Sequence, residues 1–332
     1  MKNAAPAPRS RLAVALLIGA AAGLFTTFCL GRPGFHGDFE FPWWGARLLL
    51  EGINPYGLVE YQGQSIYGGA PLFYPLPTLW LITPLAGWLP VHLAGGAAFG
   101  MATAALAYVI TRDGWWRLHL FLSGSFVIAA SLGQWSPLLM LVALVPAAGP
   151  LWIIKPTIGL AALVYRPSLF AAVAGSAVLL SSLVVVPGWL PQWLEGGARS
   201  PQHVVPVLTL WGGPLLLLAA LRWRTPAGRL LLVMSCVPQF LFFYDQLLFW
   251  LIPRTRRESL CLTLANVLGT LLWMAASFWT DQPYQQLARP FVIAFCYLPA
   301  LILVLRGHGL GWESMLGLPR WPFAFGRRGQ HL

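Results

Sequence analysis

The chain has 332 residues, of which 58% are hydrophobic and only 9% are charged, and its mean hydropathy is +0.68. A soluble domain carries about 25% charged residues, so this composition excludes an ordinary soluble globule. The formal net charge of +11 would suit a nucleic-acid-binding protein. However, the basic residues cluster at the ends of apolar runs, as in the cytoplasmic loops of membrane proteins. Such clusters are Arg222, Arg224 and Arg229; Arg254, Arg256 and Arg257; and Arg320, Arg327 and Arg328. We therefore predict a membrane protein with no nucleic-acid partner.

Continuous apolar runs recur along the chain. A helix needs about 20 residues to cross the hydrocarbon core, and continuous runs favour helices over the alternating strands of a membrane barrel. We predict an all-α polytopic protein of the cytoplasmic (inner) membrane with about ten crossings. It forms a single transmembrane domain over 1–332, with a basic C-terminal tail at 306–332. The predicted spans lie near 12–31, 73–90, 92–111, 118–132, 136–148, 150–165, 168–187, 206–222, 230–252, 260–279 and 288–305.

The N-terminus has the basic start and apolar stretch of a signal peptide. No A-x-A-like cleavage site closes that stretch, so we expect an uncleaved first span. With this basic N-terminus inside, Arg112 and Arg117 lie on the cytoplasmic side only if the span count before them is wrong.

Prolines interrupt two of the apolar regions. Residues 136–165 contain four of them and predict either two half-helices or one broken hairpin, and residues 230–252 predict a similar break at Pro238. Broken helices at membrane depth occur where they are packed in protein or line a wet cavity.

The first hydrophilic segment, 32–70, lies outside the cytoplasm if the basic N-terminus lies inside. It contains Asp38, Glu40, Glu51 and Glu60, four of the ten acidic residues, so acid chemistry is expected here. Helical spacing from Asp38 to Glu51 predicts an interfacial helix in this external loop, with Trp43 and its neighbour in the headgroup zone. A plain membrane anchor with solvated acids is the alternative interpretation.

Lys155 and Asp245 are charged residues inside apolar runs. Insertion scales assign a charge at mid-bilayer a cost of about 2.5–3.5 kcal/mol, so such residues face a cavity or a partner. We consider a functional pair and a purely structural ion pair equally acceptable. Gln134 lies in a GQWSP segment between two spans, where a turn is the simple explanation.

Other classes of site have no support in the sequence. There is no G-x-x-x-x-G-K-[ST], H-E-x-x-H, C-x-x-C or G-x-S-x-G motif. The four cysteines show no metal-type spacing, and we interpret them as small apolar residues. Two histidines, His36 and His203, fall in external-looking loops, and His36 gains weight because it lies two residues before Asp38. We expect neither a metal nor a cofactor.

The order Asp38, then ARLLLEGINPYG, then FYPLP, followed by GQWSP and IIKPT, resembles glycosyltransferase family 87 over roughly residues 12–250. That family belongs to the GT-C superfamily of membrane enzymes that use polyprenyl-phosphate sugars. The resemblance implies a GT-C-like helix bundle in which Asp38, in the first external loop, acts as general base or positions the acceptor. It also implies that the E-G-x-x-P-Y turn at Glu51, Gly52, Pro55 and Tyr56 is architectural.

This sequence departs from the family at two places. The usual Y-P-P is Tyr74-Pro75-Leu76-Pro77, and a later break that often holds Trp and His is Tyr244-Asp245-Gln246. Asp245 and His203 are therefore both candidates for the second catalytic group. Arg47 is the first candidate, and Lys155 the second, to stabilise the leaving phosphate. The remaining substrate-binding candidates are His36, Glu40, Trp43, Tyr74, Gln134 and Tyr244.

The resemblance implies a hexosyltransferase that moves a sugar, mannose in our prediction, from a polyprenyl-phosphate donor. The acceptor would be a lipid-linked or envelope glycan at the outer face. Its partners would be that donor, a glycan or glycolipid acceptor and membrane lipids. A transporter or flippase of a lipid-linked sugar would also need broken helices and intramembrane charges, although the internal repeats common in transporters are not visible. A non-catalytic assembly subunit is the third alternative.

Overall fold

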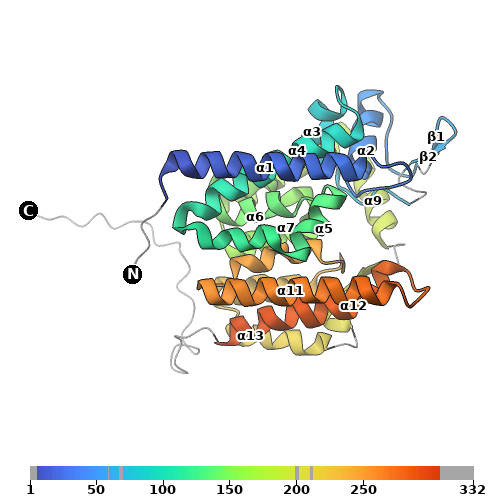
Figure 1. The fold of residues 1–332 in the computed structure, drawn as a ribbon. Helices are drawn as coiled ribbons and strands as arrows, with labels where there is room; N and C mark the ends of the chain where they lie inside the picture. The colour runs from blue at the N-terminus through green and yellow to red at the C-terminus, as the bar shows by residue number, and fades with distance from the viewer. Residues whose placement is uncertain (1–5, 59, 67–69, 199–201, 210–211, 307–332) are drawn as a thin grey trace, which may run out of the picture.

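The computed structural model describes residues 6–58, 60–66, 70–198, 202–209 and 212–306, and helices account for nearly all of the regular structure (Figure 1). The predicted basic tail, with Arg320, Arg327 and Arg328, lies outside this range. The α-helices are α1 (Pro8–Leu30), α2 (Glu40–Leu50), α3 (Leu76–Ala86), α4 (Val91–Ile110), α5 (Gly124–Leu132), α6 (Ser136–Leu144), α7 (Pro156–Tyr165), α8 (Leu169–Val185), α9 (Trp189–Ala198), α10 (Pro226–Cys236), α11 (Arg256–Ser277), α12 (Tyr284–Val292) and α13 (Leu298–Arg306).

Short segments of tighter or looser helix connect these elements. A π segment, η8 (Ile293–Tyr297), joins α12 to α13. The 3₁₀ segments are η2 (Thr111–Asp113), η3 (Trp115–Leu122), η4 (Pro146–Ile154), η5 (Pro206–Leu208), η6 (Gly213–Arg222) and η7 (Tyr244–Leu251). The described strands form two antiparallel pairs, β1 (Glu60–Tyr61) with β2 (Gln64–Ser65) and β3 (His203–Val204) with β4 (Gln239–Phe240).

The helices support a multi-pass membrane protein. Four stretches of the described chain are long and apolar enough to cross a bilayer: α1, Val91–Asp113, α11 and Tyr284–Arg306. Two bent pairs, α5 with α6 at 117° and α8 with α9 at 106°, would raise the number to six. The all-α membrane class is thus supported, but the predicted count of about ten crossings is not.

Several predicted spans are shorter elements in the structure. The predicted span 73–90 contains α3, which has 11 residues, too few to cross a bilayer. The predicted breaks are present: residues 136–165 divide into α6, η4 and α7, and the run 230–252 is interrupted between α10 and η7.

The two ends of the bundle differ in charge. Arg11 at the start of α1 donates to the Tyr108 carbonyl at the end of α4, and Gly31 at the other end of α1 lies beside His92 at the start of α4. The two helices are therefore antiparallel, and Arg112 and Arg117 lie at the same end as Arg11. We call this the arginine-rich end. Its other described members are Arg9, Arg166, Arg222, Arg224, Arg229, Arg254, Arg256, Arg257 and Arg306.

The opposite end carries α2, α3, α9 and the β1–β2 hairpin, which Figure 1 shows together at the right. We call it the acidic end, and its described acidic residues are Asp38, Glu40, Glu51, Glu60, Glu195 and Asp281. Because α3 stays at this end, only α1 and α4 cross between the N-terminus and Arg112. This explains why the sequence-based span count left Arg112 and Arg117 on the wrong side.

Glycines allow α1 and α4, the most extensively packed helix pair among the described elements, to approach closely. A Cβ on Gly100 would lie 2.8 Å from the Gly19 carbonyl oxygen and 3.1 Å from the Gly23 Cα, both backbone atoms. Small residues at such crossings permit the backbone contact that drives helix association in lipid.

We expect Gly100→Ala to destabilise the protein, because the added methyl group would force the two backbones apart, an overpacking effect of about 1–3 kcal/mol. The measurement is the melting temperature in a neutral detergent. Gly197→Ala in α9 is the matched control, since a Cβ there meets nothing within 4 Å, and its melting temperature should stay the same or rise. Equal melting temperatures for the two variants would contradict this account of the α1–α4 contact.

Candidate functional site

Five polar side chains from separate parts of the chain gather towards the acidic end. Asp38 follows α1, Gln134 lies in the turn between α5 and α6, and Lys155 separates η4 from α7. Tyr244 and Asp245 begin η7. Asp38 and Lys155 are half-buried, whereas Gln134, Tyr244 and Asp245 are at most 3% exposed, so Asp38 is the acidic member of this group that remains open to a ligand.

Two glycines bring Asp38 to Gln134. The Phe39 amide donates to the Leu132 carbonyl at 3.2 Å, which places the loop after α1 directly on the α5–α6 turn. A Cβ on Gly37 would lie 3.1 Å from the same Leu132 oxygen, and a Cβ on Gly133 would lie 2.8 Å from the Phe39 Cβ. Gly133 also adopts a φ of +68°, which favours glycine. With both residues lacking a Cβ, Gln134 donates its amide to the Asp38 carboxylate.

Lys155 and Asp245 form a buried ion pair. The Lys155 Nζ donates to both carboxylate oxygens of Asp245, at 2.7 and 2.9 Å, and lies 4.7 Å from the centre of the Tyr244 ring. The Tyr244 hydroxyl in turn hydrogen-bonds to Asp38. Lys155 is 18% exposed and Asp245 is fully buried. Lys155 is thus close to Asp38 but already neutralised by Asp245.

The backbone before this pair is strained. Phe243 is a non-glycine residue with a φ of +56°, in a region that costs a bulky side chain of order 1–3 kcal/mol and often marks a functional constraint. The strained turn directly precedes Tyr244 and aims its side chain at Asp38.

Aromatic side chains form the wall beside the polar group. Tyr74 is held by Tyr56, whose hydroxyl donates to the Tyr74 carbonyl at 2.9 Å, and its ring lies 6.3 Å from that of Trp135. His203 packs edge-on against Phe73 at 5.1 Å. These contacts assign the E-G-x-x-P-Y turn a structural part, because Tyr56 fixes the segment that carries Tyr74.

Burial sets the proton affinities of the two groups that lie outside the membrane helices. Burial raises the pKa of Asp38 to about 6, although the Lys155 charge and the hydrogen bond from Tyr244 act in the opposite direction. Burial, followed by the Lys155 charge, lowers the pKa of His203 to about 4. Near pH 7 Asp38 is therefore an ionised carboxylate of unusually high basicity, and His203 is a neutral and weak base.

This arrangement distinguishes the three acid–base candidates. A general base works best with a pKa near the working pH, which favours Asp38 over His203. Both carboxylate oxygens of Asp245 accept hydrogen bonds from Lys155. This suits a residue that holds the lysine in position better than one that accepts a proton from the substrate. Within the part of the chain that the structure describes, no three His, Cys, Asp or Glu side chains gather as metal ligands would.

Four other predicted site residues lie apart from this group. Arg47 donates to the Ala86 carbonyl at 3.3 Å and lies over the Trp43 ring, so its guanidinium is directed to the end of α3. Trp43 is 8% exposed and donates to the Leu89 carbonyl, which means that it packs against protein and not in the headgroup zone. His36 pairs with Glu40 at 2.9 Å on the surface.

Sequence reasoning did not select Trp135 or Phe240 as part of the site. Trp135 lies between Phe39 and Tyr74, and Phe240 stacks on Tyr244 at 6.3 Å. The GQWSP motif contained the signal for Trp135, because it directly follows Gln134. Phe240 lies in the generally apolar FLFFYDQ region, where no pattern separates it from its neighbours.

We expect Gly133→Ala to destabilise the protein and to separate Asp38 from Gln134, because it combines a strained φ with a clash against Phe39. Gly34→Ala in the loop after α1 is the matched control: its φ is +74°, but a Cβ there meets nothing within 4 Å. The melting temperature in detergent should fall for both variants, and further for Gly133→Ala. If the two falls were equal, the close contact at Gly133 would not matter to the fold.

Comparison of the chain with protein-family models, with curated proteins and with solved structures found no match.

Proposed function

We propose that the protein is a membrane glycosyltransferase that transfers a hexose from a polyprenyl-phosphate donor to a glycan or glycolipid acceptor at the acidic end. The observation that carries the proposal is the basic, half-buried carboxylate of Asp38, held by Gln134 and Tyr244 next to a lysine. The positive-inside rule assigns the arginine-rich end to the cytoplasm, so the acidic end, with this group, faces the outer side of the membrane.

The roles follow from the chemistry of an inverting transfer. The acceptor hydroxyl oxygen bonds to the anomeric carbon, the bond from that carbon to the phosphate oxygen breaks, and Asp38 accepts the hydroxyl proton. The lipid phosphate leaves with its negative charge, which a nearby cation stabilises. Lys155 is the better candidate for that cation than Arg47, since it lies beside Tyr244 and acts electrostatically on Asp38.

The broken helices suit a substrate that stays in the membrane. Lys155 and Tyr244 both occur where helical segments are interrupted, and irregular backbone at membrane depth is tolerated where it lines a cavity or packs against protein. Tyr74, Trp135 and His203 supply aromatic surfaces of the kind that sugar rings and prenyl chains contact.

A transporter of a lipid-linked sugar is the second candidate, favoured by one observation. The fully buried Asp245 and its lysine lie between interrupted helices, as charged groups in transporter sites do. An assay in membranes with polyprenyl-phosphate-mannose separates the two functions. Transfer yields a glycosylated acceptor, whereas transport moves the lipid-linked sugar across the membrane without forming that product.

We expect Asp38→Asn to abolish transfer while the protein still folds, because the amide cannot accept the hydroxyl proton. The melting temperature at pH 7 should not fall, because burial raises the pKa of Asp38. The folded protein thus disfavours the charged carboxylate, which the substitution replaces with a neutral amide. Glu60→Gln is the control, an equivalent carboxylate-to-amide change at an exposed position of the same external loop. Full activity of Asp38→Asn would remove the central claim.

The pH dependence of transfer gives a separate prediction. The carboxylate form of Asp38 is the active form, so kcat/KM should fall as the pH decreases through about 6. Stability should move the opposite way: because the pKa of Asp38 is about 6 in the folded protein, above the ordinary 3.8 of an aspartate, the folded state holds this proton more tightly. Its contribution to stability is therefore lost as pH rises between these values. A rate that is flat from about pH 5 to 8 would exclude Asp38 as the base.

A further inference from the structure

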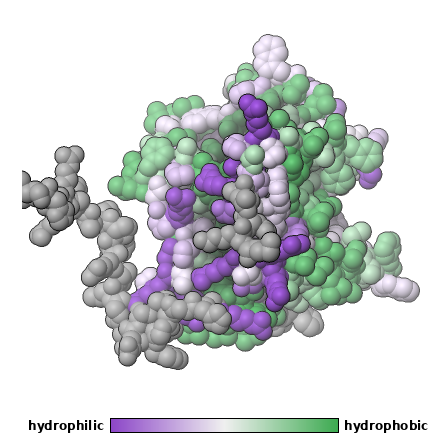
Figure 2. Space-filling view, turned by 60° about the vertical axis from the view of Figure 1, so that its left-hand side comes forward, coloured by the Kyte–Doolittle hydropathy of each residue, from purple (hydrophilic) through white to green (hydrophobic). Residues whose placement is uncertain are grey.

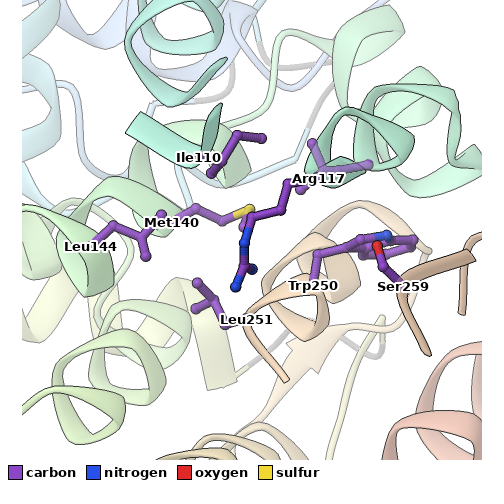
Figure 3. Close-up of a pocket in the computed structure, with 8 residues that line it drawn as sticks. Ile110, Arg117, Met140, Leu144, Trp250, Leu251 and Ser259 are labelled. Atoms are coloured by element: carbon purple, nitrogen blue, oxygen red, sulfur yellow. The ribbon is translucent and has the colours of Figure 1, made fainter. Parts of the chain in front are cut away.

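A second candidate site lies at the arginine-rich end, away from Asp38. It is a narrow cavity of about 10 Å³, room for about one water molecule, and it opens between η3, α6, η7 and the start of α11. Figure 3 shows the Arg117 side chain extending into the pocket between Met140 and Leu251. The other lining residues are Ile110, Leu120, Leu144, Trp250 and Ser259. The pocket therefore combines an apolar wall with one guanidinium group.

Arg117 has unused hydrogen-bonding capacity. Its Nε is buried without a hydrogen-bond partner. The nearest carboxylate oxygen, on Asp113, lies at 3.9 Å on a side chain that is 69% exposed, and the guanidinium also lies 4.5 Å from the Trp116 ring centre. A buried polar group without a hydrogen bond costs about 1–3 kcal/mol, so a hydrogen-bond acceptor bound in the pocket would relieve a real cost.

Further cations surround the same pocket. Arg117, Arg166 and Arg254 all act electrostatically on Tyr165, whose hydroxyl donates to the carbonyl of the pocket residue Leu251 at 3.1 Å. Arg166 donates to the carbonyl of Leu144, another pocket residue.

The negative charges nearby do not balance these arginines. Glu258 is engaged in the capping box of α11, where it accepts from the Thr255 amide, and Asp113 makes only the long contact described above. Figure 2 shows hydrophilic residues gathered on the face that looks towards this end, with apolar surface on both sides. Arg117, Arg166 and Arg254 therefore outnumber the carboxylates of Asp113 and Glu258, and the surroundings of the pocket carry an excess of positive charge.

The surroundings of Arg117 match the level of lipid headgroups. The η3 segment that carries it exposes Trp115 to 39% and Leu122 to 70%. Large exposed apolar side chains on a membrane protein face lipid, and tryptophan prefers the membrane–water interface. An arginine between such residues lies where lipid phosphates are found.

We propose that the mouth of this pocket binds the phosphate group of an anionic phospholipid in the cytoplasmic leaflet. The guanidinium of Arg117 donates to the phosphate, Arg166 and Arg254 add attraction at its mouth, and the apolar wall contacts the glycerol and upper acyl carbons. Basic pockets between membrane helices on this side suit such headgroups, and guanidinium matches phosphate oxygens in geometry and charge. A free phosphate offers the same acceptor atoms but nothing for the apolar wall.

The test uses the full-length protein in neutral detergent, with bound lipid counted by native mass spectrometry and stability followed by melting temperature. The probes are phosphatidylglycerol, phosphatidylcholine and inorganic phosphate. We expect the wild type to retain phosphatidylglycerol at least five-fold more than phosphatidylcholine, and to melt at a higher temperature with it. Arg117→Gln should lose this preference, and Arg117→Lys should keep part of it.

Arg112→Gln is the matched control, because Arg112 is exposed in the same connection and lies outside the pocket. It should behave as the wild type. If Arg117→Gln does not fold, Arg254→Gln and Arg117→Lys test the same site. Equal retention of both lipids, an equal loss in Arg112→Gln, or stabilisation by inorganic phosphate but not by phosphatidylglycerol would each overturn the proposal.

Discussion

The buried ion pair between Lys155 and Asp245 constrains the rest of the candidate site. Either charge alone in an apolar interior would be costly, and removing one partner of a buried pair typically costs 3–5 kcal/mol. The folded protein therefore pairs the two charges. This holds the interrupted segment before α7, which carries Lys155, against the start of η7, which carries Asp245. Once these two segments are joined, Tyr244 is fixed under the lysine and directed at Asp38, so the geometry around Asp38 follows from a requirement of charge burial.

Glycine and proline let the chain meet that requirement. Prolines interrupt the apolar runs at the positions where Lys155 and Asp245 need to approach, and Gly37 and Gly133 let the loop after α1 touch the α5–α6 turn. Each interruption leaves backbone groups without helical partners, which only a protein or aqueous environment can satisfy. The interrupted backbone and the buried polar side chains of the site therefore have the same requirement: both need hydrogen-bond partners from protein or water, which lipid does not supply.

Much of this could be predicted from the sequence. Composition identified a helical membrane protein, prolines located the breaks, and the cost of intramembrane charge singled out Lys155 and Asp245. The crossing number could not be predicted, because an apolar run reads the same whether it faces lipid or packs inside protein, as α3 and α7 do. The direction of the Arg47 side chain could not be predicted either. Helical spacing places it near Asp38 along α2, but the packing of α2 on α3 turns its side chain to the Ala86 carbonyl.

The η7 segment connects the two ends of the molecule over a short distance. It begins with Tyr244 beside Asp38 and ends with Trp250 and Leu251 in the wall of the arginine pocket. At about 2.0 Å of rise per residue for a 3₁₀ helix, its eight residues separate the two sites by only about 14 Å. A hydrocarbon core is about 30 Å thick. The eight residues of η7, all of them buried, thus have about half the length of the hydrocarbon core, and a single short run of packed side chains links the two sites.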